Sequence, residues 1–199
     1  MRTMLHANLT VLLSLVAVTV MPASVRAAWI NETDLPQEAD YVVLQFPASL
    51  NVSAGTLTPL VYGRIYEAGM TESFGPNPLI LADVGFGPAG SDPRTSGGWS
   101  WVAAIYNTQI GNNDEYQASF VAPLINGTYS YTYRFSVDAG ANLTAADLDG
   151  AGSNPGLTFD PSNLGLLTVT GGIVPEPGSL VLLGFGLVLL RVATRSAHA

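Results

Sequence analysis

The sequence predicts an all-β fold, an antiparallel β-sandwich, on three observations. Between residues 41 and 170, short apolar runs alternate with turn clusters rich in Gly, Pro, Asn and Asp. No stretch keeps a 3.6-residue apolar period for three turns, and residues 128–137 alternate with a period of two. Helix packing cannot use that period, whereas a strand buries one such face. The 21 Gly and 13 Pro also suit a loop-rich β protein.

Seven strands with this spacing favour an antiparallel sandwich. We expect them at Tyr41–Phe46, Thr58–Tyr66, Leu79–Phe86, Trp99–Tyr106, Glu115–Ala122, Thr128–Val137 and Leu164–Thr170. The segment 28–40 is expected to be a polar lead-in, and 148–163 a long loop. The predicted domain therefore covers residues 28–172, between two end segments.

The clearest strand is 128–137, which follows an Asn126-Gly127 turn. One face carries Tyr129, Tyr131, Tyr133, Phe135 and Val137, and the other carries Thr128, Ser130, Thr132, Arg134 and Ser136. The run Gly127-Thr-Tyr-Ser-Tyr131 resembles strand F of immunoglobulin-like domains, with tyrosine in place of the usual cysteine. The resemblance implies that the Tyr129 hydroxyl bonds back to backbone near the turn, and that Trp99 or Trp101 is the core tryptophan.

Residues 1–27 have the pattern of a secretory signal peptide. Arg2 gives a positive start, an apolar run extends from Ala7 to Val20, and Val25 and Ala27 occupy the −3 and −1 positions of a small-residue cleavage site. We therefore expect a signal helix and cleavage after Ala27. The alternative is an uncleaved N-terminal anchor.

The C-terminal segment, 173–199, combines three features in order. Val174, Pro175, Glu176 and Pro177 precede an apolar run from Leu180 to Leu190, and Arg191 and Arg195 follow. The two prolines keep the motif out of a helix. The apolar run predicts a short transmembrane helix, and the arginines predict a cytoplasmic C-terminal side.

This segment resembles the PEP-CTERM sorting signal of Gram-negative bacteria. The resemblance implies recognition by an exosortase at the Pro-Glu-Pro motif, an inner-membrane intermediate, and then release or transfer to the cell surface. Tails of that family usually end in a tight Arg/Lys cluster, whereas here two arginines are spread over five residues. A plain anchor that is never cut and a eukaryotic glycolipid-anchor signal are the alternatives.

Composition limits the chemistry of residues 28–172. The only histidines are His6 and His198, and the chain has no Cys and no Lys. A Ser-His-Asp triad, a Cys-His pair, a His-ligated zinc site and a Schiff base are therefore excluded there. We predict that the protein is not an enzyme. Because Asp114 and Glu115 are adjacent on a strand, they point to opposite faces and cannot flank one bond.

Charge limits the partners. Three arginines stand against fourteen acidic side chains in residues 28–172, a net charge of −11. Such a surface repels nucleic acid and anionic lipid and attracts cations. We expect no resident cofactor. Calcium at Asp147 and Asp149, with help from Asp138, Asn142 and Asp160, is the alternative to an Asp-rich turn.

The segment 61–150 also looks like accessory β-domains of secreted bacterial hydrolases and adhesins, to which we attach no activity. We therefore predict an exported, non-catalytic surface or extracellular-matrix protein. The alternative is a carbohydrate- or calcium-binding module that acts in extracellular polysaccharide. Trp99 and Trp101 share one strand face and can stack on sugars.

Overall fold

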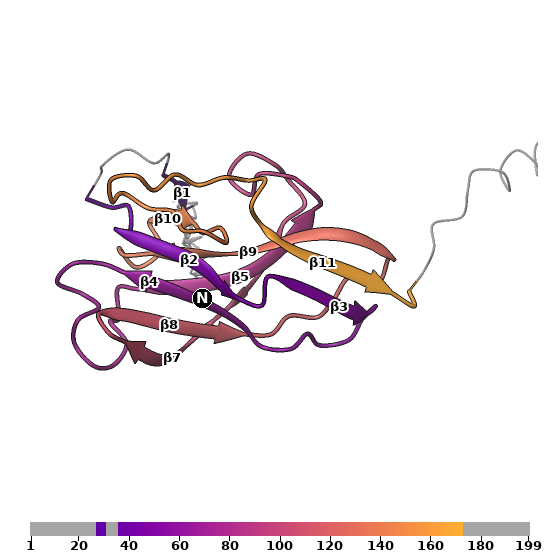
Figure 1. Ribbon diagram of the computed structural model, residues 1–199, viewed down its shortest axis with the longest axis horizontal. Coiled ribbons are helices and arrows are strands. Elements are labelled where there is room, and N and C mark those ends of the chain that lie inside the picture. The colour runs from indigo at the N-terminus through magenta and orange to yellow at the C-terminus, as the bar shows by residue number, and fades with distance from the viewer. Residues whose placement is uncertain (1–26, 31–35, 173–199) are drawn as a thin grey trace, which may run out of the picture.

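The computed structural model describes residues 27–30 and 36–172, and every regular element in them is a strand. The eleven strands form a seven-stranded and a four-stranded sheet (Figure 1). They are β1 (Ala28–Trp29), β2 (Tyr41–Phe46), β3 (Ser49–Ser53), β4 (Val61–Tyr66), β5 (Leu81–Pro88), β6 (Ser100–Ala103), β7 (Ile105–Ile110), β8 (Asn113–Ala118), β9 (Gly127–Ser136), β10 (Asn142–Ala145) and β11 (Gly165–Thr170). The predicted all-β fold is confirmed.

The two predicted helices, in the signal segment and over Leu180–Leu190, lie outside the described residues. Inside the described ranges, no helix has the length and apolar character that crossing a membrane requires.

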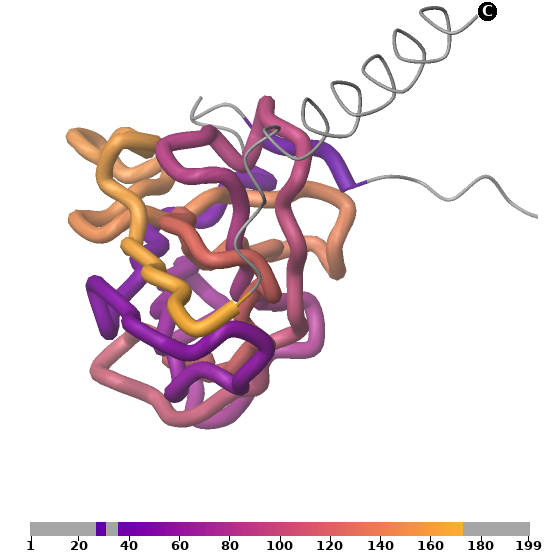
Figure 2. The backbone as a smooth tube through the Cα atoms, turned by 90° about the vertical axis from the view of Figure 1, so that its right-hand side faces the viewer, coloured from indigo at the N-terminus to yellow at the C-terminus, as the bar shows by residue number. Residues whose placement is uncertain are grey.

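Strand β9 is the centre of the seven-stranded sheet. On one side it pairs antiparallel with β5, which pairs in turn with β6. On the other side its first half pairs with β11 and its second half with β10. Two parallel pairs extend the sheet, β3 beside β11 and β1 beside β10. Figure 2 shows the yellow end of β11 beside the violet segment that holds β3.

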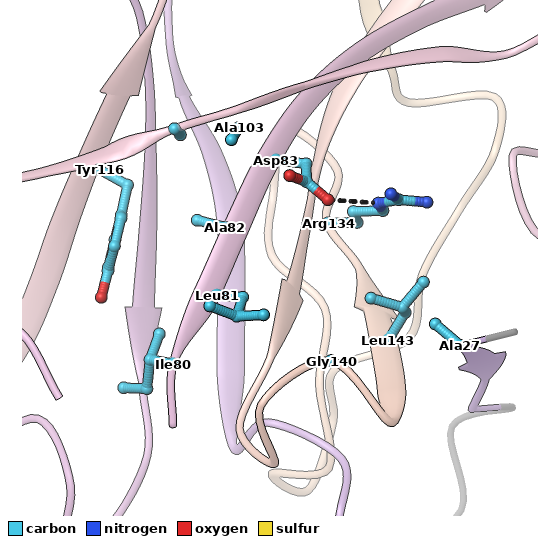
Figure 3. Close-up of a pocket in the computed structure, with 11 residues that line it drawn as sticks. Ala27, Ile80, Leu81, Ala82, Asp83, Ala103, Tyr116, Arg134, Gly140 and Leu143 are labelled. Carbon is cyan, nitrogen blue, oxygen red and sulfur yellow. Dashed lines mark hydrogen bonds and ion pairs between the residues drawn. The ribbon is translucent and has the colours of Figure 1, made fainter. Parts of the chain in front are cut away.

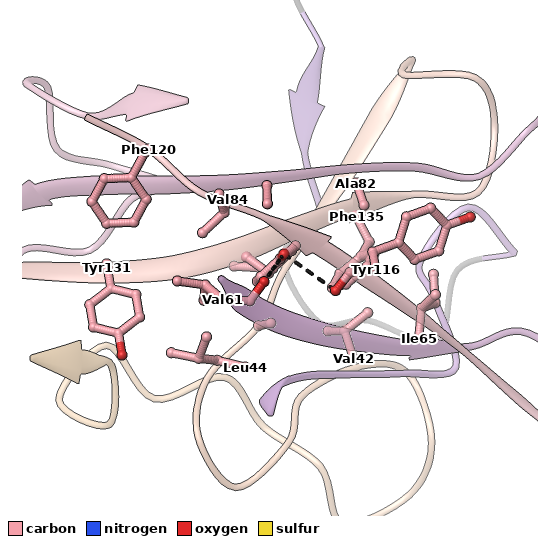
Figure 4. Packing of buried hydrophobic residues seen from close by; sticks show 14 of the residues in the cluster. Val42, Leu44, Val61, Ile65, Ala82, Val84, Tyr116, Phe120, Tyr131 and Phe135 are labelled. Carbon is pink, nitrogen blue, oxygen red and sulfur yellow. Dashed lines mark hydrogen bonds between the residues drawn. The ribbon is translucent and has the colours of Figure 1, made fainter. Parts of the chain in front are cut away.

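The four-stranded sheet has the order β2-β4-β8-β7 and is antiparallel throughout. Its inward residues pack against the inward face of β5 and β9 (Figure 4). The rings of Tyr116 and Phe135, one from each sheet, meet edge to face at 6.0 Å. The inward face predicted for β9 is confirmed, because Tyr131, Tyr133 and Phe135 belong to the core cluster between the sheets. Thr132 and Ser136 of the opposite face are buried as well but do not belong to that cluster.

The expected strand at Trp99–Tyr106 is in fact two strands in different sheets. β6 pairs with β5, and β7 pairs with β8. The chain crosses between the sheets at Ala104, whose N–H still donates to the Ala82 carbonyl at 2.8 Å. The apolar run continues through the crossing, so the sequence pattern alone does not reveal it.

Three further strands, β1, β3 and β10, lie in stretches that were expected to be loops or lead-in. Each has two to five residues and borders a longer strand that is already paired. Pairing partners far away in the chain stabilise them, so local sequence carries little signal for them.

Candidate functional site

An ion pair lies on the outer face of the seven-stranded sheet. The alternation that buries Tyr133 and Phe135 turns Arg134 away from the core, and Asp83 of β5 is its direct cross-strand partner. The Arg134 Nε donates to the Asp83 Oδ2 at 2.8 Å, and each side chain is about one-quarter exposed (24% and 26%). No other side-chain hydrogen bond of Arg134 is found among the described residues, so its terminal nitrogens keep donors for a ligand.

Two tryptophans from opposite edges of this sheet meet above the ion pair. Trp29 comes from β1 and Trp101 from β6, and their ring centroids are 5.9 Å apart. The Arg134 guanidinium carbon is 4.4 Å from the Trp101 centroid and 5.9 Å from that of Trp29. Cation–π attraction therefore helps to hold the guanidinium in place.

A third tryptophan extends the row. Trp99 stacks with Trp101, with centroids 5.4 Å apart and planes 18° from parallel. The two indoles cover Gly87 and Gly85 of β5, where a Cβ atom would overlap the ring atoms. Only glycine allows the rings to approach the sheet so closely.

The prediction that Trp99 or Trp101 is the core tryptophan is therefore wrong. Neither belongs to the buried cluster between the sheets, and both are partly exposed on the outer face. Phe86 of β5 packs against the core instead, and its ring contacts Phe120 and Tyr129 at 5.2 and 6.2 Å.

A cavity of about 340 Å³ borders the ion pair. Its lining includes Asp83 and Arg134 together with apolar side chains from β5 and β10, among them Leu81 and Leu143 (Figure 3). Ala27, the predicted last residue of the signal peptide, lines it as well. We call the three tryptophans, Arg134 and Asp83 the aromatic face. It combines flat apolar rings with charged hydrogen-bonding groups, which suits a ring-shaped ligand that carries hydroxyl groups.

The predicted calcium residues have different environments. The Asp147 carboxylate is fully buried and accepts the N–H groups of Gly150 (2.7 Å) and Asp160 (2.8 Å), whereas Asp149 is exposed. Burial raises the pKa of Asp147 to about 6, against the lowering effect of those two N–H groups. Asp147 thus fastens the loop that follows β10.

The other residues considered for calcium also bind within their own turns. Asp138 accepts the backbone and side-chain N–H groups of Asn142 at 2.9 and 2.6 Å, and Asp160 accepts the Ser162 hydroxyl at 2.7 Å. Over the described ranges, no three His, Cys, Asp or Glu side chains gather as metal ligands.

The neighbouring acids of β8 point to opposite sides, as predicted from strand geometry. Asp114 lies on the inward side with Tyr116, and Glu115 accepts the Asn107 side-chain amide at 2.5 Å. Both Asp114 oxygens are buried without a hydrogen-bond partner in the structure. Burial raises the Asp114 pKa to about 6.

The predicted bond of Tyr129 is confirmed. Its hydroxyl donates to the Ile125 carbonyl at 2.9 Å, four residues upstream and beside the turn. Trp29, Asp83 and Arg134 were not among the site residues predicted from the sequence. Arg134 could have been noticed, since it is the one charged residue between 128 and 137.

The comparison with protein families finds the PEP-CTERM protein-sorting motif at residues 174–196. The match includes the predicted Val174, Pro175, Glu176 and Pro177, the apolar run from Leu180 to Leu190, and both Arg191 and Arg195. These residues lie outside the described part of the structure. The chain carries the sorting motif of an exported, exosortase-processed protein.

Part of the chain is similar to parts of bacterial amylopullulanases. The enzyme of Thermoanaerobacterium saccharolyticum is 31% identical over 110 residues, 48% of this chain and 8% of that protein. That of Thermoanaerobacter thermohydrosulfuricus is 28% identical over 135 residues, 59% of this chain and 9% of the enzyme. That of Thermoanaerobacterium thermosulfurigenes is 32% identical over 94 residues, 40% of this chain and 5% of the enzyme. The chain thus spans less than a tenth of each relative.

Proposed function

We propose that this is a non-catalytic surface protein whose β domain binds neutral polysaccharide at the aromatic face. The observation that carries the proposal is the row of Trp99, Trp101 and Trp29 above the Arg134–Asp83 pair. Indole faces pack against the C–H faces of sugars, and the arginine and carboxylate bind hydroxyl groups. The net charge of −11 disfavours acidic polysaccharides. The relatives' name supports a glucan such as pullulan.

We further infer that the domain is an immunoglobulin-like sandwich. The sheet β2-β4-β8-β7 corresponds to strands A, B, E and D, and β5-β9-β11 to C, F and G. Under this assignment β9 is strand F, and the bond of Tyr129 to Ile125 is its tyrosine corner. Phe86 on strand C then replaces the tryptophan of antibody domains.

Affinity electrophoresis in gels that contain pullulan, with alginate gels for comparison, tests the binding proposal. We expect pullulan to retard the protein and alginate not to. Trp101→Ala removes the central ring and should abolish retardation. Phe74→Ala is the matched control, because it removes a ring that is 87% exposed and outside the site. Equal migration of the native protein with and without pullulan would contradict the proposal.

For sorting, we propose that an exosortase cuts at the Pro-Glu-Pro motif and frees the domain from an inner-membrane intermediate to the cell surface or matrix. Glu176→Ala in the native host should leave the protein in the membrane fraction. Glu72→Ala, an exposed glutamate of the domain, is the control. Unchanged release of the Glu176 variant would count against the proposal.

Calcium at Asp147 and Asp149 stays a prediction. The two N–H bonds already made by Asp147 argue for a structural role of this carboxylate. Calorimetric titration with calcium decides the question, since binding heat that disappears in Asp149→Asn would establish a site.

A further inference from the structure

Three segments at one end of the sandwich carry no charged residue. The loops 54–60 and 119–126 and the exit of the chain at 171–172 contain no Asp, Glu, Lys or Arg. Hydrogen bonds join these segments, from the N–H of Thr58 to the Phe120 carbonyl (2.9 Å) and from that of Gly172 to the Asn126 side chain (2.5 Å). Figure 2 looks onto this end, where the yellow end of β11 meets the segment of β3.

The same segments expose five large apolar side chains, Leu57, Leu60, Val121, Leu124 and Ile125, of which four form what we call the exit patch: Leu57, Val121, Leu124 and Ile125. Leu57 and Leu124 are 65% and 64% exposed. Leu57 and Val121 are bridge partners, and the Leu124 side chain approaches Gly55, two residues before Leu57. Single exposed leucines need no explanation, but a contiguous group of them marks a contact surface.

The absence of charge distinguishes these three segments from the rest of the domain, which is acidic. None of the fourteen acidic side chains of residues 28–172 lies in the three segments. The loop after β5, which starts on the same side, carries Asp92 and Arg94, and these form an ion pair with each other at 3.0 Å. That loop therefore adds no net charge.

The chain leaves the domain at Gly172, beside the exit patch. The apolar run Leu180–Leu190 follows a short distance later in the sequence. Residues 173–179 separate Gly172 from Leu180, and even a fully extended chain of this length spans less than about 30 Å. A domain of this size has a radius of gyration of about 15 Å, so the connection is shorter than the domain is wide. Whatever holds Leu180–Leu190 therefore lies next to the end that carries Gly172.

We propose that the exit patch rests on the lipid bilayer while the precursor is anchored. The inference depends on the proposed sorting, which places Leu180–Leu190 in the membrane. Contact through the three uncharged segments buries apolar side chains in the bilayer interface without desolvating an unpaired charge. The acidic surfaces elsewhere are repelled by anionic lipid and stay in water. The patch thus orients the domain on the membrane before it is released.

Fluorescence quenching on the full chain in vesicles tests this contact. Because the chain has no cysteine, Thr56→Cys, beside Leu57, can carry a single environment-sensitive NBD label. Asn112→Cys is the matched control, since it is exposed in the turn before β8 and lies at the other end of that strand. In phosphatidylcholine vesicles we expect a blue shift at position 56 and loss of emission with doxyl-labelled lipid, and neither effect at position 112.

A second substitution ties the effect to the patch. The double variant Leu57→Ser, Thr56→Cys should lose most of the quenching of the label. The double variant Phe74→Ser, Thr56→Cys removes a similar exposed apolar surface elsewhere and should keep the quenching. Vesicle flotation first reports whether the chain is anchored. A chain that does not float overturns both the anchor and the contact. A chain that floats with an unquenched label at position 56 overturns the contact alone. A third outcome is a blue shift that occurs without lipid quenching and that disappears as the protein is diluted in the bilayer. That outcome shows a second copy of the chain at the patch, and it also overturns the lipid contact.

Discussion

The two faces of β9 differ in what they contact. On the inner face, Tyr131, Tyr133 and Phe135 are fully buried, and the Tyr133 hydroxyl donates to the Val61 carbonyl of the facing sheet at 2.7 Å. On the outer face, Arg134 is partly exposed under Trp29 and Trp101. One alternating strand therefore supplies both the core and the candidate site, and substitutions on its two faces should separate stability from binding.

The inner face should give the largest loss of stability. Phe135→Ala removes a fully buried ring that contacts Tyr116 and Tyr133. We expect the free energy of unfolding to fall by about 3–5 kcal/mol, from lost burial and the cavity left behind. Urea denaturation followed by tryptophan fluorescence measures this. A loss below about 1 kcal/mol would mean that the core is not organised around β9.

The buried acid beside this core should make stability depend on pH. The folded-state pKa of Asp114 is raised to about 6, so the folded protein binds the proton more tightly than the unfolded chain. Its contribution is fully present below the unfolded pKa, near 4, and is lost as the pH rises through about 6. Asp114→Asn should raise the stability at pH 8 by about 2 kcal/mol relative to the native protein and change it little at pH 3.5.

Urea midpoints of both proteins at the two pH values give the comparison. Asp147 and Glu67 also have raised pKa values, so the difference between the two proteins, rather than the slope of either one, isolates Asp114. An equal difference in stability between the two proteins at both pH values would contradict the raised pKa of Asp114.

The contact of the indoles with β5, on the outer face, should give a smaller loss of stability and a loss of binding. Gly85→Ala places a methyl group against Trp101 ring atoms and the Ser100 carbonyl oxygen. We expect a cost of about 1–3 kcal/mol from overpacking and a displaced ring. Pullulan retardation should weaken even where the variant is fully folded. Unchanged retardation would show that the position of Trp101 over Gly85 does not matter for binding.

The smallest effect is expected at the turn before β9. Tyr129→Phe removes the hydroxyl that donates to Ile125 and keeps the ring. We expect a loss of about 1 kcal/mol, since the carbonyl is at an exposed position where water can replace the donor. Glycan binding should not change, and thermal unfolding together with affinity electrophoresis checks both.

The sequence predicts the long strands well, because burial of one face leaves a period-two pattern in the chain. β2 has the predicted bounds, and β9 and β11 differ by one residue at one or both ends. The crossing at Ala104 and the strands β1, β3 and β10 depend on partners far away in the chain, and their residues alone do not specify them.

The candidate site was only partly predictable for the same reason. Trp99 and Trp101 were recognised as a pair, but a tryptophan carries no mark of which side of a sheet it covers. The glycines beneath them, Gly85 and Gly87, are decisive only once the pairing of β5 and β6 is known. Trp29 joins the site through the two-residue strand β1, which has no pattern of its own.

The carboxylate of Asp147 has a practical consequence for following this protein in cells. It holds the backbone at Gly150 and at Asp160, so the intervening segment is fixed on both sides. Pro155 and Gly156, both exposed, lie between these points. An epitope tag inserted there extends into solvent while the flanking backbone keeps its attachment. Antibody labelling of intact cells then distinguishes protein at the cell surface from protein retained inside the cell envelope.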